Sequence, residues 1–170
     1  MWADDIQELY KIGYSLDDVK ATLQRNVNIR MDDAEVTGKV GEVINVPIWM
    51  GEILEKNKAA TLDTPDTITE LKQATVKEQM VGEYQLSTLD RLFYIRLQNQ
   101  MRELRPRDRD GVESMMIGLF RMRRGKIVRL ADSTKMTADI KKRISIEERT
   151  FFESINKEGE LLKKRVGANE

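Results

Sequence analysis

The sequence predicts an α+β fold, with a small N-terminal β-rich domain that contains a short helix, followed by a mainly α-helical bundle domain. Apolar and polar residues alternate over 19–31, as in a half-buried strand. A β-branched stretch at 43–46 then leads directly into a helix that Pro47 can begin. Toward the C-terminus the apolar spacing is helical throughout. We therefore predict two domains, 1–63 and 64–170.

The N-terminal domain is predicted to open with a short helix over residues 3–12, where apolar side chains recur at helical spacing. The strand over 19–31 follows. The polar cluster 32–35 is typical of a turn, and residues 36–46 supply one or two further strands. Together these strands would form a small sheet.

The corner between the last of these strands and the helix is the most specific stretch. Gly38 and Gly41 mark a turn, Asn57 is a stop signal for the helix, and residues 60–62 can return as a strand. The apolar side of the helix comprises Ile48, Trp49, Met50, Ile53 and Leu54. A purely structural interpretation is that the proline and the tryptophan fix the corner and fill a core. We define the corner motif as Val46, Pro47, Ile48, Trp49 and Leu54.

The bundle domain is predicted to start after Thr64-Pro65-Asp66. Thr67 and Glu70 are spaced as a capping box for a helix that runs to about Val81 and bends near Gly82. A second helix is predicted from a stripe at spacings of three and four that stops at the next proline. The stripe comprises Leu86, Leu89, Phe93, Leu97, Met101 and Leu104.

The rest of the bundle is predicted to be helical as well. Residues 108–111 are interpreted as a turn and helix start, because their likeness to a calcium loop fails at Val112. A long helix is predicted over 112–132, with Gly125 as a kink. Ser145 and Glu148 are spaced as a capping box for a last helix. Its apolar side comprises Phe151, Phe152, Ile155, Leu161 and Leu162.

Composition limits the chemistry that the chain can carry. It has no cysteine and no histidine, which removes disulfides, thiolate nucleophiles, the commonest general base and the usual zinc ligands. Adjacent acidic pairs fall at turns or helix starts, where acids serve structural roles: Asp4/Asp5, Asp17/Asp18, Asp32/Asp33 and Glu147/Glu148. No phosphate loop or hydrolase signature is present. We predict no catalysis, no cofactor and no metal, and we expect a soluble cytoplasmic protein without a signal peptide or membrane span.

Charge is balanced overall but unevenly distributed, with 29 basic and 29 acidic residues. Residues 1–65 carry 12 acidic and 7 basic side chains, whereas 105–143 carries 5 acidic and 12 basic ones. The densest part supplies a candidate surface for a partner or DNA: Arg121, Arg123, Arg124, Lys126 and Arg129. A solvated helix face, pairing with acids of a partner subunit, and phosphate binding are all open interpretations.

A second candidate surface is apolar and rich in methionine. We predict a subunit interface at Met101, Met115, Met116, Leu119 and Phe120. Methionine also fills gaps in ordinary cores, so an intramolecular core is an equally good interpretation.

The segment VPIWMGEIL, from Val46 to Leu54, resembles the valine-proline-leucine-tryptophan-leucine-alanine-x-x-leucine segment in the small domain of GINS subunits. It is similar to the two types called Psf two and Psf three in eukaryotes, in which the small domain precedes the helical one. Gly38, Gly41 and Pro65 fall where that family would place them. The resemblance is looser over 121–130 and 145–152.

The short chain looks like the archaeal version of this subunit. The resemblance implies a heterotetramer, with two copies of this chain and two of a sister subunit of opposite domain order. It further implies a non-catalytic scaffold in DNA replication that bridges the MCM replicative helicase and a Cdc45/RecJ-like protein at the fork, is associated with primase, and lies at the chromosome (nucleoid). Contact with DNA is expected to be weak or indirect. We predict that the helical domain builds the oligomer, while the small domain docks on outside partners.

Two other classes of function stay open. A stand-alone nucleic-acid-binding protein would use the basic segment 105–143. An enzyme with carboxylate-bound magnesium would require acids from separate helices to converge.

Overall fold

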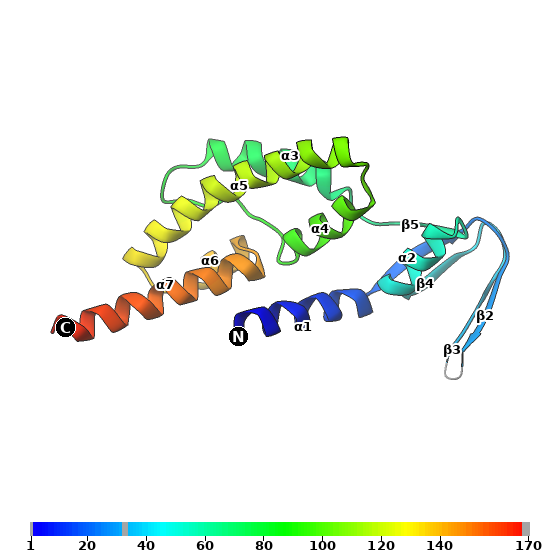
Figure 1. Cartoon of the computed structure of the whole chain (residues 1–170), viewed down its shortest axis with the longest axis horizontal. Coiled ribbons are helices and arrows are strands. Elements are labelled where there is room, and N and C mark those ends of the chain that lie inside the picture. Colours follow the sequence, from blue (N-terminus) through cyan, green and yellow to red (C-terminus); the bar gives the residue numbers. More distant parts are fainter. Residues whose placement is uncertain (1, 32–33, 168–170) are drawn as a thin grey trace. The chain divides into compact units, whose positions relative to one another are not determined.

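The computed structural model describes residues 2–31 and 34–167, and the chain divides into two compact units, Met1–Pro65 and Asp66–Glu170. The first unit contains a short helix and small β-strands, and the second is built from helices (Figure 1). The predicted α+β fold class is therefore confirmed. In the part of the chain that is described, no helix combines the length and apolar character needed to cross a bilayer.

A three-stranded antiparallel sheet organises the first unit. Its strands are β1 (Asp18–Leu23), β4 (Val43–Pro47) and β5 (Ala60–Leu62), in the order β4-β1-β5. Val19 pairs with Val46, and Ala21 pairs with both Ile44 and Leu62 across its two neighbours. The helix α1 (Trp2–Leu16) precedes the sheet and extends four residues beyond its predicted end.

The predicted single strand over 19–31 is wrong, because the backbone turns between β1 and the hairpin of β2 (Val27–Met31) and β3 (Ala34–Gly38). At this turn Gln24 N donates to Ala59 O, and Asn26 Oδ1 accepts from Val40 N. The first bond continues the pairing of β1 with β5 by one residue, and the second holds the turn that follows it. Of the predicted turn, residues 34–35 belong to β3 and Asp32-Asp33 lies outside the described residues.

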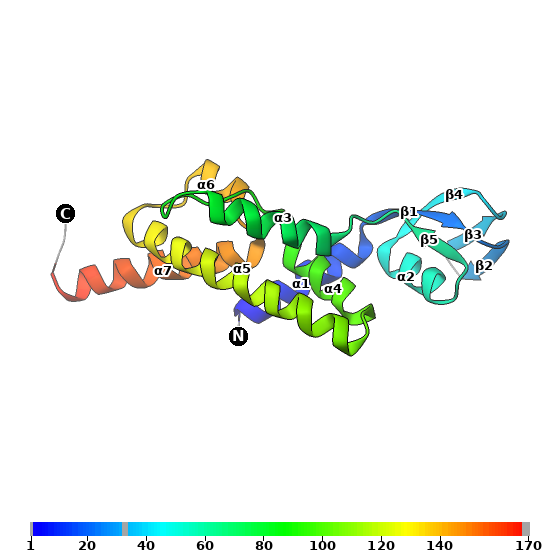
Figure 2. The same cartoon turned by 90° about the horizontal axis from the view of Figure 1, so that it is seen from above.

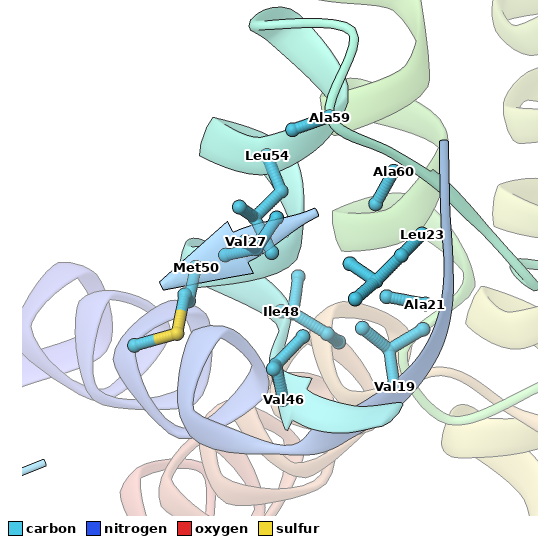
Figure 3. Close-up of a cluster of buried hydrophobic side chains, with 10 residues drawn as sticks. All are labelled: Val19, Ala21, Leu23, Val27, Val46, Ile48, Met50, Leu54, Ala59 and Ala60. Atoms are coloured by element: carbon cyan, nitrogen blue, oxygen red, sulfur yellow. The ribbon is translucent and has the colours of Figure 1, made fainter. Parts of the chain in front are cut away.

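The helix α2 (Ile48–Lys56) packs on the three-stranded sheet. Ile48 and Leu54 of the helix belong to one buried cluster with Val46 and Leu23 of the sheet (Figure 3). Trp49 is 37% exposed, so the interpretation in which it fills the core is wrong. The side of the helix that meets the sheet instead consists of Ile48, Met50, Gly51 and Leu54, which are buried.

Gly51 permits this packing by lacking a side chain. A Cβ atom there would lie 2.8 Å from Cδ2 of Leu62 and 3.1 Å from Cγ1 of Val19. Both contacts are tighter than ordinary van der Waals separations, so glycine lets α2 approach the sheet closely. Pro47 lies half-buried just before the helix starts.

The second unit consists of α3 (Thr67–Met80), α4 (Phe93–Glu103), α5 (Pro106–Ser133), α6 (Ala138–Arg143) and α7 (Ile146–Arg165). Figure 2 shows α3 and α7 running alongside α5, the longest of the five. The predicted turn at 108–111 is wrong, since α5 starts at Pro106 and continues through it. Proline is favourable at this first position because its missing N–H would have no helical partner there.

Of the two capping boxes predicted from the sequence, one is confirmed and the other is wrong. The capping box at Ser145 is confirmed: its Oγ accepts from Glu148 N at 3.3 Å, and Glu148 Oε2 accepts from Ser145 N at 3.1 Å. The capping box at Thr67 is wrong, because Asp66 caps α3 by accepting from Ile68 N at 3.1 Å.

Residues 81–92 form an irregular connection, although their apolar spacing predicted the first turns of a helix. Leu86 and Leu89 are buried in two different clusters of the bundle, which a straight helix would not reach together. Backbone hydrogen bonds from Leu89 N to Arg143 O and from Ile146 N to Arg91 O tie this connection to the end of α6 and the start of α7.

Candidate subunit interface

A buried ionic cluster holds the centre of the helical unit. The guanidinium of Arg123, from the middle of α5, is fully buried. Its Nη1 donates to Glu78 Oε2 of α3 at 2.6 Å, while Nε and Nη2 donate to the two carboxylate oxygens of Glu148 on α7 at 2.6 and 2.9 Å. The fork of the guanidinium matches the second carboxylate in a bidentate pair. Arg123 therefore joins three helices.

The same guanidinium also binds the backbone around it. Nη1 donates to Ser87 O and Nη2 to Arg143 O, each at 2.9 Å. Glu78 in turn accepts from the backbone N and the hydroxyl of Ser87, and Lys126 Nζ lies 2.8 Å from its other oxygen. The cluster thereby fixes the irregular connection 81–92 against the helices, and its charges are compensated within the unit.

Ionisation within the cluster follows from these contacts. Burial alone would raise the pKa of Glu78, but hydrogen bonds from Lys126 and Ser87 and the charge of Arg123 outweigh it, so this pKa lies below its usual value. Burial would lower the pKa of Arg123, yet Glu148 and Glu78 raise it. Burial and the negative charge of Glu148 raise the pKa of Tyr94, whose hydroxyl donates to that carboxylate. These contacts favour the charged forms of Glu78 and Arg123.

Arg123 corrects the predicted basic surface. It was expected on a surface for a partner or DNA, but the structure places it on the buried side of α5. The buried residues of this helix are Leu119, Arg123, Ile127 and Ala131, which recur every four positions. Three of the four are apolar, so this spacing is the signal that could have placed the arginine inside.

The other predicted basic residues divide into two groups. Lys126 is largely covered, and its Nζ donates to the backbone carbonyls of Glu78 and Val81 at the end of α3. Arg121, Arg124 and Arg129 are exposed, and Arg129 pairs with Glu83 at 3.2 Å. The predicted set is therefore not one continuous basic surface.

The predicted methionine-rich interface is also divided. Met101 and Leu119 are buried in the bundle's own core with Leu97 and Phe93, which makes them unavailable to a partner. Met115 and Met116 pack partly against that core. This is the gap-filling role that methionine often takes in cores. Of the predicted set, Phe120 is the exposed member, at 45%.

Phe120 belongs to a larger apolar surface on α5 and α7, which lie side by side (Figure 2). We define the α5–α7 face as the exposed residues Ile117, Phe120, Arg124, Val128 and Phe151. The four members on α5 recur at spacings of three and four, so they share one side of that helix. Arg124 lies over the ring of Phe120, with 5.7 Å from the guanidinium carbon to the ring centroid.

A cavity of about 150 Å³ opens at this face. It is lined by Tyr94, Gln98, Phe120, Arg124, Ile127, Glu147, Glu148 and Phe151, from α4, α5 and α7. A cavity of similar size is large enough for a benzene ring. The site can therefore receive one aromatic or branched apolar side chain, and the ionic cluster beneath it holds Tyr94 and Glu148 in the wall.

Acidic side chains do not converge as a magnesium enzyme would require. Among residues 2–31 and 34–167, no group of three or more acidic side chains is placed to hold a metal ion. In the pair Glu147/Glu148, the second carboxylate is engaged by Arg123 and Ser145.

Residues 50–167 match the family model of the GINS complex protein helical bundle domain, named Sld5. This match covers more than half of the chain. The chain belongs to the GINS family. The match in this GINS chain includes every helix of the second unit and begins within α2 of the first. None of the curated proteins matches the sequence.

Membership in the GINS family explains the helical bundle around the ionic cluster. It also gives the chain a role in the GINS replication complex. GINS subunits act by assembling with one another, so this GINS chain is a subunit of a larger complex. On the α5–α7 face of this bundle, exposed aromatic side chains lie beside a cavity.

Proposed function

We propose that the chain is a non-catalytic scaffold subunit of the archaeal type, resembling Psf two and Psf three, and that its α5–α7 face is the contact with a sister GINS subunit. Two copies of each would form a heterotetramer. The observation that carries this proposal is the exposed Phe120–Phe151 pair beside a preformed cavity, within a domain of the GINS family. Aromatic side chains that become buried on binding dominate the binding energy of many interfaces.

The partner helix is expected to complement this face in shape and charge. One large apolar side chain would enter the cavity, where Ile127 and the two phenylalanines surround it. An acidic residue about one turn away would meet Arg124 at the rim. Such a pairing combines a desolvated anchor with a charge contact that orients the two subunits.

In the assembled complex, the first unit would serve as the small domain, over about 1–63, and the second as the helical domain. The proposed task is to bridge the MCM helicase and a Cdc45/RecJ-like protein at the replication fork, with primase as an associated partner. The exposed Trp49 and Ile53 of α2 provide apolar area for such contacts. Support for this task comes from the family and from the resemblance of the corner motif.

The direct experiment is to co-express the chain with the sister subunit and measure the mass of the purified assembly by light scattering. The expected mass corresponds to two copies of each chain. A well-folded monomer of this chain that ignores the sister subunit would contradict the proposal. A complex of another stoichiometry would refute the heterotetramer while leaving the subunit contact in place.

A further inference from the structure

The helix α1 carries a row of apolar side chains that are exposed to solvent. Ile6, Leu9, Ile12 and Leu16 are 42%, 66%, 55% and 61% exposed. Their spacings of three, three and four place them along one side of a 15-residue helix. Such a stripe normally covers a core or a partner, and four residues in register are more than scattered surface apolar groups.

The stripe is separate from the core of the first unit. Tyr14, one position of α1 outside the stripe, packs against that core, which is otherwise formed by the sheet, β2 and α2. The members of the stripe are absent from this cluster. The unit therefore has a complete core without using the apolar side of α1.

The charge of residues 1–18 narrows the choice of partner that could cover the stripe. Residues 1–18 carry five acidic side chains and one basic one, Lys11, which pairs with Glu8 at 2.7 Å. An anionic bilayer or a nucleic acid would be repelled by this charge. Antiparallel pairing of two copies of α1 would bring Asp5 of one close to Asp17 and Asp18 of the other, so like charges also oppose self-association.

We propose that α1 is a docking helix that inserts this stripe into an apolar groove, rimmed by lysine and arginine, on a protein outside the GINS assembly. The partner would recognise the apolar side chains of the stripe, which are spaced about one turn apart, as in other helix-in-groove complexes. Asp5 and Glu8 are exposed beside the stripe and would face the basic rim. The core of the first unit forms without the stripe, so the exposed apolar side of α1 is left for a partner.

The test uses the full chain, co-purified with its sister subunit, and two probes: the purified MCM helicase and the purified Cdc45/RecJ-like protein. The choice of probes rests on the proposed function. Leu9→Glu is expected to weaken binding to one probe by about tenfold or more, because it places a carboxylate among the anchors. The double change Asp5→Lys with Glu8→Lys is expected to weaken the same binding and to reduce its dependence on salt.

Val40→Glu is the matched control, because Val40 is 64% exposed in the same unit and lies outside α1. It should leave both affinities unchanged. Light scattering on each variant checks that assembly with the sister subunit persists, which separates failure of this inference from failure of the proposed function. Unchanged affinity of Leu9→Glu for both probes overturns the inference. Two other results would also overturn the inference. One is binding of the wild-type chain to anionic vesicles, and the other is its concentration-dependent self-association, if Leu9→Glu abolishes the effect.

Discussion

Arg123 shows how one side chain can change the interpretation of a segment. In the sequence it is one of several neighbouring arginines, whereas in the structure it is the buried link between α3, α5 and α7. A buried charge needs compensation from partners on other elements, and local charge density does not reveal those partners. The identities of Glu78 and Glu148 as partners, 45 and 25 residues away, could not be predicted from the sequence.

Replacing Arg123 by methionine should destabilise the helical unit by about 3–5 kcal/mol, because Glu148 would remain buried without its cation. Urea unfolding followed by circular dichroism measures this loss. Arg124→Met is the matched control on the same helix. Since Arg124 is exposed, its loss should cost less than about 1 kcal/mol. Equal effects of the two substitutions would show that the cluster does not hold the bundle.

Glu78 should make the stability of the unit depend on acid. Its pKa in the folded state lies below the unfolded value, so its contribution is fully present above about pH 5 and is lost as the pH falls through the folded-state pKa. Glu78→Gln removes this titration. The free energy of unfolding of the variant should therefore be lower at neutral pH and fall less steeply below about pH 5, by up to about 1.4 kcal/mol per pH unit. An unchanged slope would contradict the assignment.

At the scale of elements, the sequence predicted most of the helices and the corner between β4 and α2, because their apolar spacing and caps are local signals. It failed where tertiary contacts decide the backbone. Leu86 and Leu89 continue the spacing of α4, yet they lie in an irregular connection that hydrogen-bonds to the start of α7. The strand expected over 19–31 breaks because residues 24–26 bond to other loops.

The α5–α7 face was also predicted from the sequence only in part. Exposure of Phe120 was expected from the sequence as part of an interface, but its neighbour Leu119 points into the core. Adjacent positions on a helix point in different directions, so a cluster in sequence is not a surface patch. Phe151 was expected on an apolar side of the last helix, and its position beside Phe120 required the packing of α5 on α7.

The close packing of α2 on the sheet can be tested with two glycine substitutions. Gly51→Ala should lower the stability of the first unit by about 1 kcal/mol, since the new methyl group would crowd Leu62 and Val19. Gly118→Ala meets open space in the middle of α5 and should stabilise the second unit by about 0.4–1 kcal/mol. Tryptophan fluorescence follows the first unit, which contains both Trp2 and Trp49, whereas far-ultraviolet circular dichroism is dominated by the five helices of the second. Stabilisation by Gly51→Ala would contradict the close approach.

At the scale of the whole molecule, the two units differ in what they offer to partners. The helical unit has a cavity with aromatic walls and charges compensated inside, which suits a permanent contact with another subunit. The first unit exposes apolar side chains on α1 and α2 within an acidic stretch of the chain. This arrangement supports our proposal of a bundle that assembles with the sister subunit and a small unit that contacts other proteins.

The affinity of this chain for its sister subunit tests the central claim most directly. Phe120→Glu and Phe151→Glu should each weaken it by about 30-fold or more, which corresponds to the loss of a central anchor worth at least about 2 kcal/mol. Val76→Glu also replaces an exposed apolar side chain by a carboxylate, on α3 of the same unit. It should leave the affinity within about twofold of the wild type. If the two phenylalanine variants bind as tightly as Val76→Glu, the α5–α7 face is not the subunit interface.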